Sequence, residues 1–127
     1  MSEQLSPAVR RLLSRHIRSV EQLEVLLLLH GQPSRFWSAK EVYDVVRSSE
    51  SSIVERLSAF TKLGFLVEEN GSPPTFRYAP QEQDLRSAVD EAAIAYRTWR
   101  IRVIEAIFAP EVDPVQSFAD AFKLRKD

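Results

Sequence analysis

The sequence of 127 residues contains no cysteine, which excludes disulfides, thiolate nucleophiles and every cysteine-ligated zinc or iron–sulfur site. It has only three glycines, and it contains no glycine-rich phosphate loop, GxSxG, HExxH or paired-carboxylate motif. Its two histidines, His16 and His30, lie far apart in sequence and share no repeated carboxylate partner, as a metal site would need. We therefore expect neither an enzyme nor a protein that requires a metal or another cofactor.

Long apolar runs and a surplus of one charge are missing as well. No segment approaches the roughly 20 uncharged apolar residues of a membrane span, and the polar start, Met1 to Gln4, leads into arginines without the apolar core of a secretory signal. Seventeen basic residues against eighteen acidic ones leave a net charge of -1, so any attraction to nucleic acid must come from a local patch. These features predict a soluble, cytoplasmic protein with no membrane partner.

The residues that are present can fill one hydrophobic core. Apolar residues make up 44% of the chain and charged residues 28%, and the length is that of one ordinary domain. We predict a single domain over residues 1–127. Within it we expect an N-terminal basic amphipathic helix at 5–18, a core unit at 19–80 and a C-terminal helical extension at 81–127.

The N-terminal helix is predicted from a helical repeat of apolar residues. Val9, Leu13, Ile17 and Val20 fall on one side at spacings of three and four. The opposite side carries four arginines within about 140° of arc, namely Arg10, Arg11, Arg15 and Arg18. This arginine face could be a solvated surface, which could then pair with acids of a neighbouring subunit, or a surface that contacts phosphates. An anionic membrane surface is less favoured, because the apolar side is needed for packing.

Two capping boxes mark the starts of helices in the core unit. Ser19 and Gln22 begin a helix whose run Leu26 to Leu29 is too apolar for the surface, so it should be the central buried helix, ending at His30-Gly31. After a short strand at Phe36-Trp37, Ser38 and Glu41 begin a second helix that we expect to pack through Val42, Val45 and Val46.

A third helix and a β-hairpin complete the core unit. The third helix follows the serines at 48–52, places Ile53, Leu57 and Phe60 on its inner side, and ends at Gly64. Strands at 65–69 and 75–79 flank a turn that contains Asn70-Gly71. The order of helix, strand, helix, helix and hairpin predicts a mainly α fold with a small β-hairpin wing.

A single long helix is predicted from about Glu82 to Ala109, roughly 40 Å in length. One seam alternates by fours and threes through Leu85, Val89, Ala92, Tyr96, Trp99, Val103 and Ile107. Ile94, Ile101, Ile104 and Phe108 project to another side, so one partner surface cannot bury everything that this helix carries. We therefore predict a dimerisation helix that uses Ile94, Tyr96, Trp99, Ile101, Ile104 and Phe108.

A short closing helix is predicted after Pro110 and Pro114. Its apolar positions are Val115, Phe118, Ala119 and Phe122, with Ala121 beside them. It ends in Lys123, Arg125 and Lys126, whose positive charges suit the C-terminus of a helix.

Three short motifs in residues 19–79 resemble the winged helix-turn-helix domain of bacterial transcriptional regulators, in particular the MarR-like group. They are the capped start Ser38-Ala-Lys-Glu41, the segment Ile53-Val-Glu-Arg-Leu57, and Lys62-Leu-Gly-Phe-Leu-Val67 leading into the hairpin. The resemblance covers about half of the chain, and these regulators often add dimerisation helices at either end. It implies a third helix in the major groove, a second helix across the backbone, and a wing beside them.

The resemblance also implies DNA-contacting residues. On the outward side of the third helix these are Ser51, Glu55, Ser58 and Lys62, with Ser52 beside them and Arg56 at the edge. The candidates for backbone contacts are Lys40 and Arg77. The arginine face of the N-terminal helix would join them if the fold brings that helix beside the third helix of the core unit; its residues are Arg10, Arg11, Arg15 and Arg18. The implied function is a homodimeric, DNA-binding transcriptional regulator that contacts double-stranded DNA through two half-sites about one duplex turn apart.

An alternative function follows from the charges of the third helix and the wing. From Glu50 to Lys62 the chain carries two acidic and two basic residues, and the turn of the hairpin has neither arginine nor lysine. Counterion release, the main source of affinity for DNA, would be small from these elements alone. The alternative is a winged-helix interaction module that docks a protein partner without significant binding to DNA.

Overall fold

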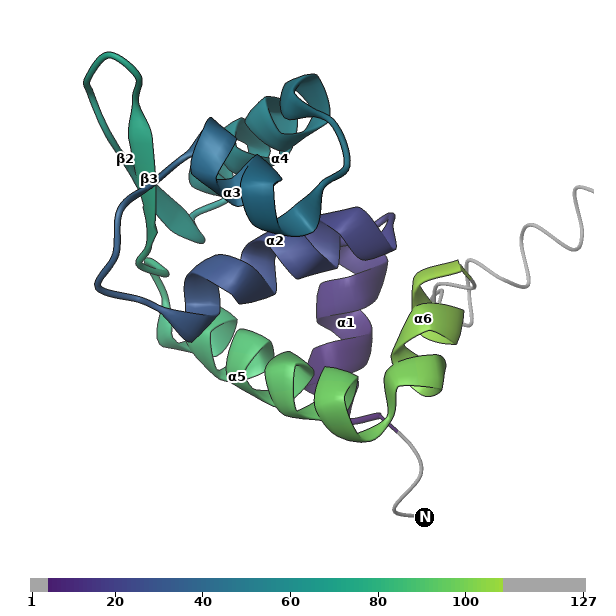
Figure 1. Cartoon of the computed structure of the whole chain (residues 1–127). Helices are drawn as coiled ribbons and strands as arrows, with labels where there is room; N and C mark the ends of the chain where they lie inside the picture. Colours follow the sequence, from purple (N-terminus) through teal and green to yellow (C-terminus); the bar gives the residue numbers. More distant parts are fainter. Residues whose placement is uncertain (1–4, 109–127) are drawn as a thin grey trace, which may run out of the picture.

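The computed structural model describes residues 5–108, which form a winged helix with additional helices at both ends (Figure 1). The sheet is three-stranded and antiparallel, in the order β1-β3-β2. Along the described chain the elements are α1 (Pro7–His16), α2 (Val20–Gly31), β1 (Trp37–Ser38), α3 (Ala39–Val46), α4 (Glu50–Lys62), β2 (Leu66–Glu69), β3 (Thr75–Tyr78), α5 (Gln83–Thr98) and α6 (Arg100–Phe108). The predicted closing helix at 115–126 lies outside the described residues.

The helices and strands form two parts that meet at α2. The winged unit consists of α2, α3, α4 and the three strands, and the base layer consists of α1, α5 and α6 (Figure 1). In the base layer α1 packs against α5 and α6, and in the winged unit α2 packs against α3, α4 and β3. Because α2 also packs against α5, it joins the two parts into one hydrophobic core.

Helix α2 is the central buried helix, as its apolar run predicts. Leu23, Leu26 and Leu29 are fully buried. The Ser19 hydroxyl accepts a hydrogen bond from the backbone N–H of Gln22 at 3.1 Å, which confirms the predicted N-cap. The side chain of Gln22 reaches back one residue further than a capping box requires, because it accepts from the backbone N–H of Arg18.

Helices α3 and α4 are oriented by their caps and their buried sides. Ser38 and Glu41 form both hydrogen bonds of the predicted capping box at the start of α3. On α4, Ser49 is the N-cap, and the predicted inner side of Ile53, Leu57 and Phe60 is buried. The prediction for Val45 is wrong: its side chain is 57% exposed, because α3 packs through Val42 on the neighbouring side of the helix.

The β-hairpin wing follows α4 directly, as predicted. Leu66 of β2 lies opposite Tyr78 of β3, and Glu69 lies opposite Thr75. The strand expected at Phe36-Trp37 is shifted by one residue, since β1 pairs Trp37 with Phe76 and Ser38 with Thr75. This register buries the Trp37 side chain and leaves Phe36 partly exposed.

The prediction of a single helix from Glu82 to Ala109 is wrong, because the helix is interrupted at Trp99. Trp99 has φ -129° and ψ 49°, outside the helical region, so α5 ends at Thr98 and α6 begins at Arg100. Helix α6 then turns to lie beside α1, as Figure 1 shows. Val103 and Ile107 of α6 are buried by this return. The N-terminal helix is also shorter than the predicted 5–18, since Ile17 has extended backbone angles.

Candidate nucleic-acid interface

The outward side of α4 is open to solvent. Ser51, Glu55 and Lys62 are exposed, and Ser58 is half-buried. This orientation follows from the opposite side of the helix, where Ile53, Leu57 and Phe60 are packed into the core. Helix α4 therefore has the buried apolar row and the outward polar row that the site prediction requires.

The two predicted backbone contacts lie on elements that flank α4. Lys40 is exposed in the first turn of α3, where its Nζ is 3.6 Å from Asp44 Oδ1. Arg77 lies on β3 and its guanidinium carbon is 5.2 Å from the centre of the Phe36 ring. A surface ion pair of this kind is weak and easily exchanged for another partner. Lys40 can therefore reach an external anion at small cost.

Two predicted contact residues of α4 face α2 instead of the solvent side. Ser52 Oγ donates to Glu21 Oε1 at 2.7 Å, and Arg56 Nε donates to the same oxygen at 3.1 Å. Ser48 Oγ donates to the other oxygen, Glu21 Oε2. Burial would raise the pKa of Glu21, but the three hydrogen bonds and the charge of Arg56 outweigh burial and hold this pKa below its ordinary value.

Glu21, the acceptor at the centre of this cluster, was not among the residues predicted from the sequence. An acidic residue in the first turn of a helix is explained by the helix dipole alone, so Glu21 carries no distinctive signal. A signal was available on and just before α4: Ser48, Ser52 and Arg56 recur every four residues beside the buried row. Such a stripe of donors at the edge of a packed side predicts an acceptor on the neighbouring element.

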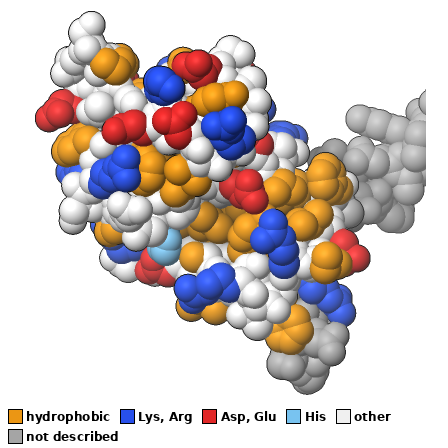
Figure 2. Space-filling model, viewed as in Figure 1, with side chains coloured by type: hydrophobic (Ala, Val, Ile, Leu, Met, Phe, Trp, Pro, Cys, Tyr) orange, Lys and Arg blue, Asp and Glu red, His pale blue; other side chains and the backbone are white. Residues whose placement is uncertain are grey.

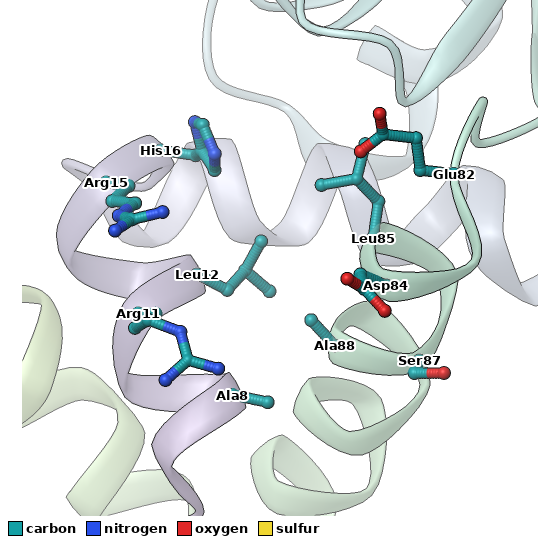
Figure 3. A pocket seen from close by; sticks show the side chains of 10 residues that line it. All are labelled: Ala8, Arg11, Leu12, Arg15, His16, Glu82, Asp84, Leu85, Ser87 and Ala88. Carbon is teal, nitrogen blue, oxygen red and sulfur yellow. The ribbon is translucent and has the colours of Figure 1, made fainter.

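The four arginines of the first helix belong to the base layer. Arg10 Nη1 donates to the backbone oxygen of Leu5 at 2.7 Å, and Arg18 is exposed just after the end of α1. Arg11 and Arg15 line a hollow of about 400 Å³ between α1 and the start of α5 (Figure 3). Helix α1, which carries Arg10, Arg11 and Arg15, packs against α5 and α6 within the base layer.

The hollow between α1 and α5 has walls of opposite charge. Figure 3 shows Arg11 and Arg15 on one wall and Glu82 and Asp84 on the other. His16 lies at one end of the hollow, and its pKa is lowered by burial and by the positive charge of Arg15. With carboxylates so close, these arginines add little net positive potential to the surface.

The predicted dimerisation residues divide into an exposed group and a half-buried group. Ile94, Ile101 and Phe108 are 56%, 67% and 70% exposed, which is unusual for such large apolar side chains. Ile104, Tyr96 and Trp99 are half-buried. Tyr96 Oη donates to Glu24 Oε2 at 3.1 Å, and Trp99 and Ile94 line a shallow hollow of about 200 Å³ with Leu5 and Val9.

A second apolar surface lies between the winged unit and the base layer. Figure 2 shows hydrophobic side chains across the middle of the face it presents. A hollow of about 360 Å³ is lined there by Glu24, Leu27, Leu28, Val45, Val46 and Tyr96. The exposure of Val45 contributes to this surface.

Neither a metal cluster nor a membrane-spanning helix is present among the described residues. Within residues 5–108 no group of three or more His, Asp or Glu side chains is arranged to hold a metal ion. In the same part of the chain no helix is both long and apolar enough to cross a membrane.

The fold is similar to that of a protein of known structure. No family model and no curated protein sequence matches the chain. The crystal structure of the M. tuberculosis transcriptional regulator MosR is similar to this structure, with a TM-score of 0.55 and 16% sequence identity. The match covers 98% of this chain and 87% of the MosR chain. The chain therefore has the fold of a winged helix with flanking helices, which a known transcriptional regulator shares.

Proposed function

We propose that this chain is a DNA-binding transcriptional regulator that acts as a winged-helix homodimer. The observation that carries the proposal is the exposed polar side of α4, held outward by its buried Ile53, Leu57 and Phe60 and followed directly by the wing. In winged helix-turn-helix proteins a helix in this position enters the major groove. The likeness of fold to a transcriptional regulator supports the same function.

Each exposed polar residue has a role suited to its chemistry. Ser51 and Ser58 can hydrogen-bond to a base or a phosphate, Glu55 can accept from a cytosine amino group, and Lys62 can bind guanine or a phosphate. Lys40 and Arg77 would bind the phosphate backbone on either side of α4.

The homodimer is proposed from the apolar side chains that the described chain leaves exposed. Ile94, Ile101 and Phe108 lie on the two consecutive helices α5 and α6. Burial of apolar area yields about 25 cal/mol per Å², so a second copy that covered these side chains would gain stability. A two-fold axis through this surface would present two α4 helices to half-sites about 34 Å apart.

A salt titration tests the binding to DNA. A labelled non-specific duplex is titrated at about 50 mM and about 200 mM salt, where about six phosphate contacts would give a large loss of affinity. Lys62→Glu and Arg77→Glu should weaken binding. Arg86→Glu is the matched control, because Arg86 is an exposed base near the start of α5, away from α4 and from the proposed dimer surface. Binding that is absent at the lower salt concentration would reject the proposal.

Sedimentation tests the homodimer. The wild-type chain should sediment as a dimer at tens of micromolar, and Ile101→Asp should shift it to the monomer. Val54→Asp is the control, because Val54 is 49% exposed on α4, away from the proposed dimer surface. A wild-type chain that is monomeric at this concentration would rule out the dimer.

A protein-interaction module is the second candidate, and the surface of α4 and the wing favours it. Val54 and Leu63 are 49% and 45% exposed, and the strand β2 presents Glu68 and Glu69 to solvent. Apolar side chains beside carboxylates suit a protein partner better than a phosphate backbone. The same titration separates the two functions, since an interaction module would show no salt-dependent binding to DNA.

A further inference from the structure

Three donors, one just before α4 and two in its first half, converge on one carboxylate. Glu21 lies in the first turn of α2, and its side chain is only 17% exposed. One of its oxygens accepts from Ser52 and Arg56, at 2.7 Å and 3.1 Å, and the other accepts from Ser48. Both oxygens are therefore occupied by groups from the segment that begins α4.

The cluster fixes the first half of α4 against α2. Ser48 lies in the connection between α3 and α4, and Ser52 and Arg56 follow at intervals of about one helical turn. A hydrogen bond to a charged group contributes roughly twice as much as one between neutral groups. Glu21 thus sets both the position of α4 and the direction of the Arg56 side chain.

The cluster also changes the charge that α4 offers to a ligand. Arg56 is 29% exposed, and its guanidinium is already paired with Glu21. The charged side chains of α4 that remain exposed are Lys62, Glu50 and Glu55, which are one cation and two carboxylates. A phosphate backbone approaching α4 meets a surface that has lost one of its two positive charges.

We infer that Glu21 is a positioning residue that withholds Arg56 from DNA, and so limits the affinity of α4 for the phosphate backbone. The inference rests on the proposed function in DNA binding. A duplex phosphate is the external anion that competes with Glu21, because a guanidinium binds carboxylates and phosphates with the same geometry. Removing the charge of Glu21 frees Arg56 to bind a phosphate.

Helix α2 supplies a matched control in Glu24, less than one turn further along. Glu24 Oε2 accepts from Tyr96 and is 3.7 Å from Arg100 Nη2, so this carboxylate faces the base layer. Glu24→Gln removes the same charge from the same helix as Glu21→Gln does. It leaves the pairing of Arg56 unchanged.

The experiment is a salt titration of a labelled non-specific duplex with the full chain. The proteins are the wild type, Arg56→Gln, Glu21→Gln, the double variant and Glu24→Gln. Arg56→Gln should leave the slope of log K against log salt unchanged. Glu21→Gln should steepen the slope by about 0.9 for each bound protomer, so that its affinity falls about 3.5-fold more than that of the wild type between about 50 and about 200 mM salt. The double variant and Glu24→Gln should both match the wild type.

The outcomes separate this inference from the proposed function. A flatter slope for Arg56→Gln would show that Arg56 already contacts DNA, and an unchanged slope for Glu21→Gln would show that its charge restrains nothing; either result overturns the inference and leaves the function standing. Binding by Glu21→Gln but not by the wild type would support the inference and count against the function of the wild-type chain. No binding by any of the five proteins would overturn both.

A measurement on the wild-type chain does not depend on how the variants fold. The Nε–H resonance of Arg56 is followed by NMR while duplex is added. It should keep its position while the backbone resonances of Ser51 and Glu55 move. A shift of the Arg56 resonance that follows the duplex concentration would contradict the inference.

Discussion

Gly64 joins α4 to the wing, and replacing it with alanine tests this joint. Gly64 has φ +93°, which L residues rarely adopt, and its backbone oxygen accepts from the N–H of Gln81 at 2.9 Å. A side chain in the left-handed region costs about 1–2 kcal/mol. The new Cβ would lie 3.1 Å from Gln81 Oε1, the end of a flexible side chain that can move, so this contact adds little.

The net effect of Gly64→Ala is smaller than the strain alone. Alanine restricts the unfolded chain more than glycine does, which returns about 0.5 kcal/mol of stability. We therefore expect Gly64→Ala to lower the free energy of unfolding by about 1 kcal/mol.

Gly31 is the matched control, because it is exposed at the end of α2 and a Cβ added there would have nothing within 4 Å. Gly31→Ala should raise the free energy of unfolding by about 0.5–1 kcal/mol, since alanine is the better helix former. The two variants should then differ by about 2 kcal/mol, or roughly 8 °C in melting temperature for a domain of this size. Thermal unfolding followed by circular dichroism measures both. Equal melting temperatures for the two variants would refute the argument that φ at Gly64 is fixed by the fold.

Three further predictions concern the buried groups around α1, β3 and α6. Burial and the charge of Arg15 lower the pKa of His16 in the folded state, so the stability of the wild-type chain should fall as the pH drops below 6.5. His16→Phe should weaken this dependence when melting temperatures are compared at about pH 7.5 and about pH 5.5. Identical pH profiles for the two proteins would contradict the prediction. Burial and Asp90 raise the pKa of Tyr78 to about 12, with Arg86 opposing them, so the stability that this neutral phenol contributes is complete below pH 10 and is lost as the pH rises from 10 towards 12. Tyr78→Phe should remove that alkaline loss, and a variant that loses stability as steeply as the wild type would disprove the assignment. Val103→Ala should lower the free energy of unfolding by about 2 kcal/mol, measured by urea unfolding of a dilute sample, because Val103 is buried. Ile101→Ala should lower it by less than about 0.5 kcal/mol, because Ile101 is exposed. Equal losses would show that α6 does not pack on α1 and α5 as described.

Much of the winged unit could be predicted from local sequence signals. The hydroxyls of Ser19 and Ser38 cap helices where the sequence places them, and the turn around Asn70 separates two paired strands. These signals act over three to five residues, so they do not depend on how distant parts of the chain pack. The buried row of α4 was predictable for a similar reason, because a helix with one apolar side has one way to face a core.

The break between α5 and α6 could not be predicted in the same way. Residues 83–108 contain neither proline nor glycine, and the apolar spacing by fours and threes runs through Trp99 without a change. The pattern is the same for one straight helix and for two helices that fold back. Contact of α6 with α1 decides between them, and that contact joins segments far apart in the sequence.

The orientation of the candidate site's side chains could be predicted where they face solvent. It could not be predicted where they hydrogen-bond to a residue of another helix. The helical period alone places Ser51, Glu55 and Lys62 outward. The same reasoning assigned Ser52 and Arg56 to DNA, because it had no means of placing Glu21 from α2 within 3.1 Å of them. The donors at every fourth position indicate that an acceptor lies beside them, but which distant residue supplies it depends on the packing of two helices.

Two links between the base layer and the winged unit end at the same point. His16, the last residue of α1, sets its ring against Phe65 with the centroids 5.4 Å apart. Gln81, just before α5, donates its backbone N–H to Gly64. A rotation of the base helices would therefore move residues 64–65, which join α4 to the wing. These two contacts connect the base layer directly to the joint beside the proposed DNA-contacting side of α4.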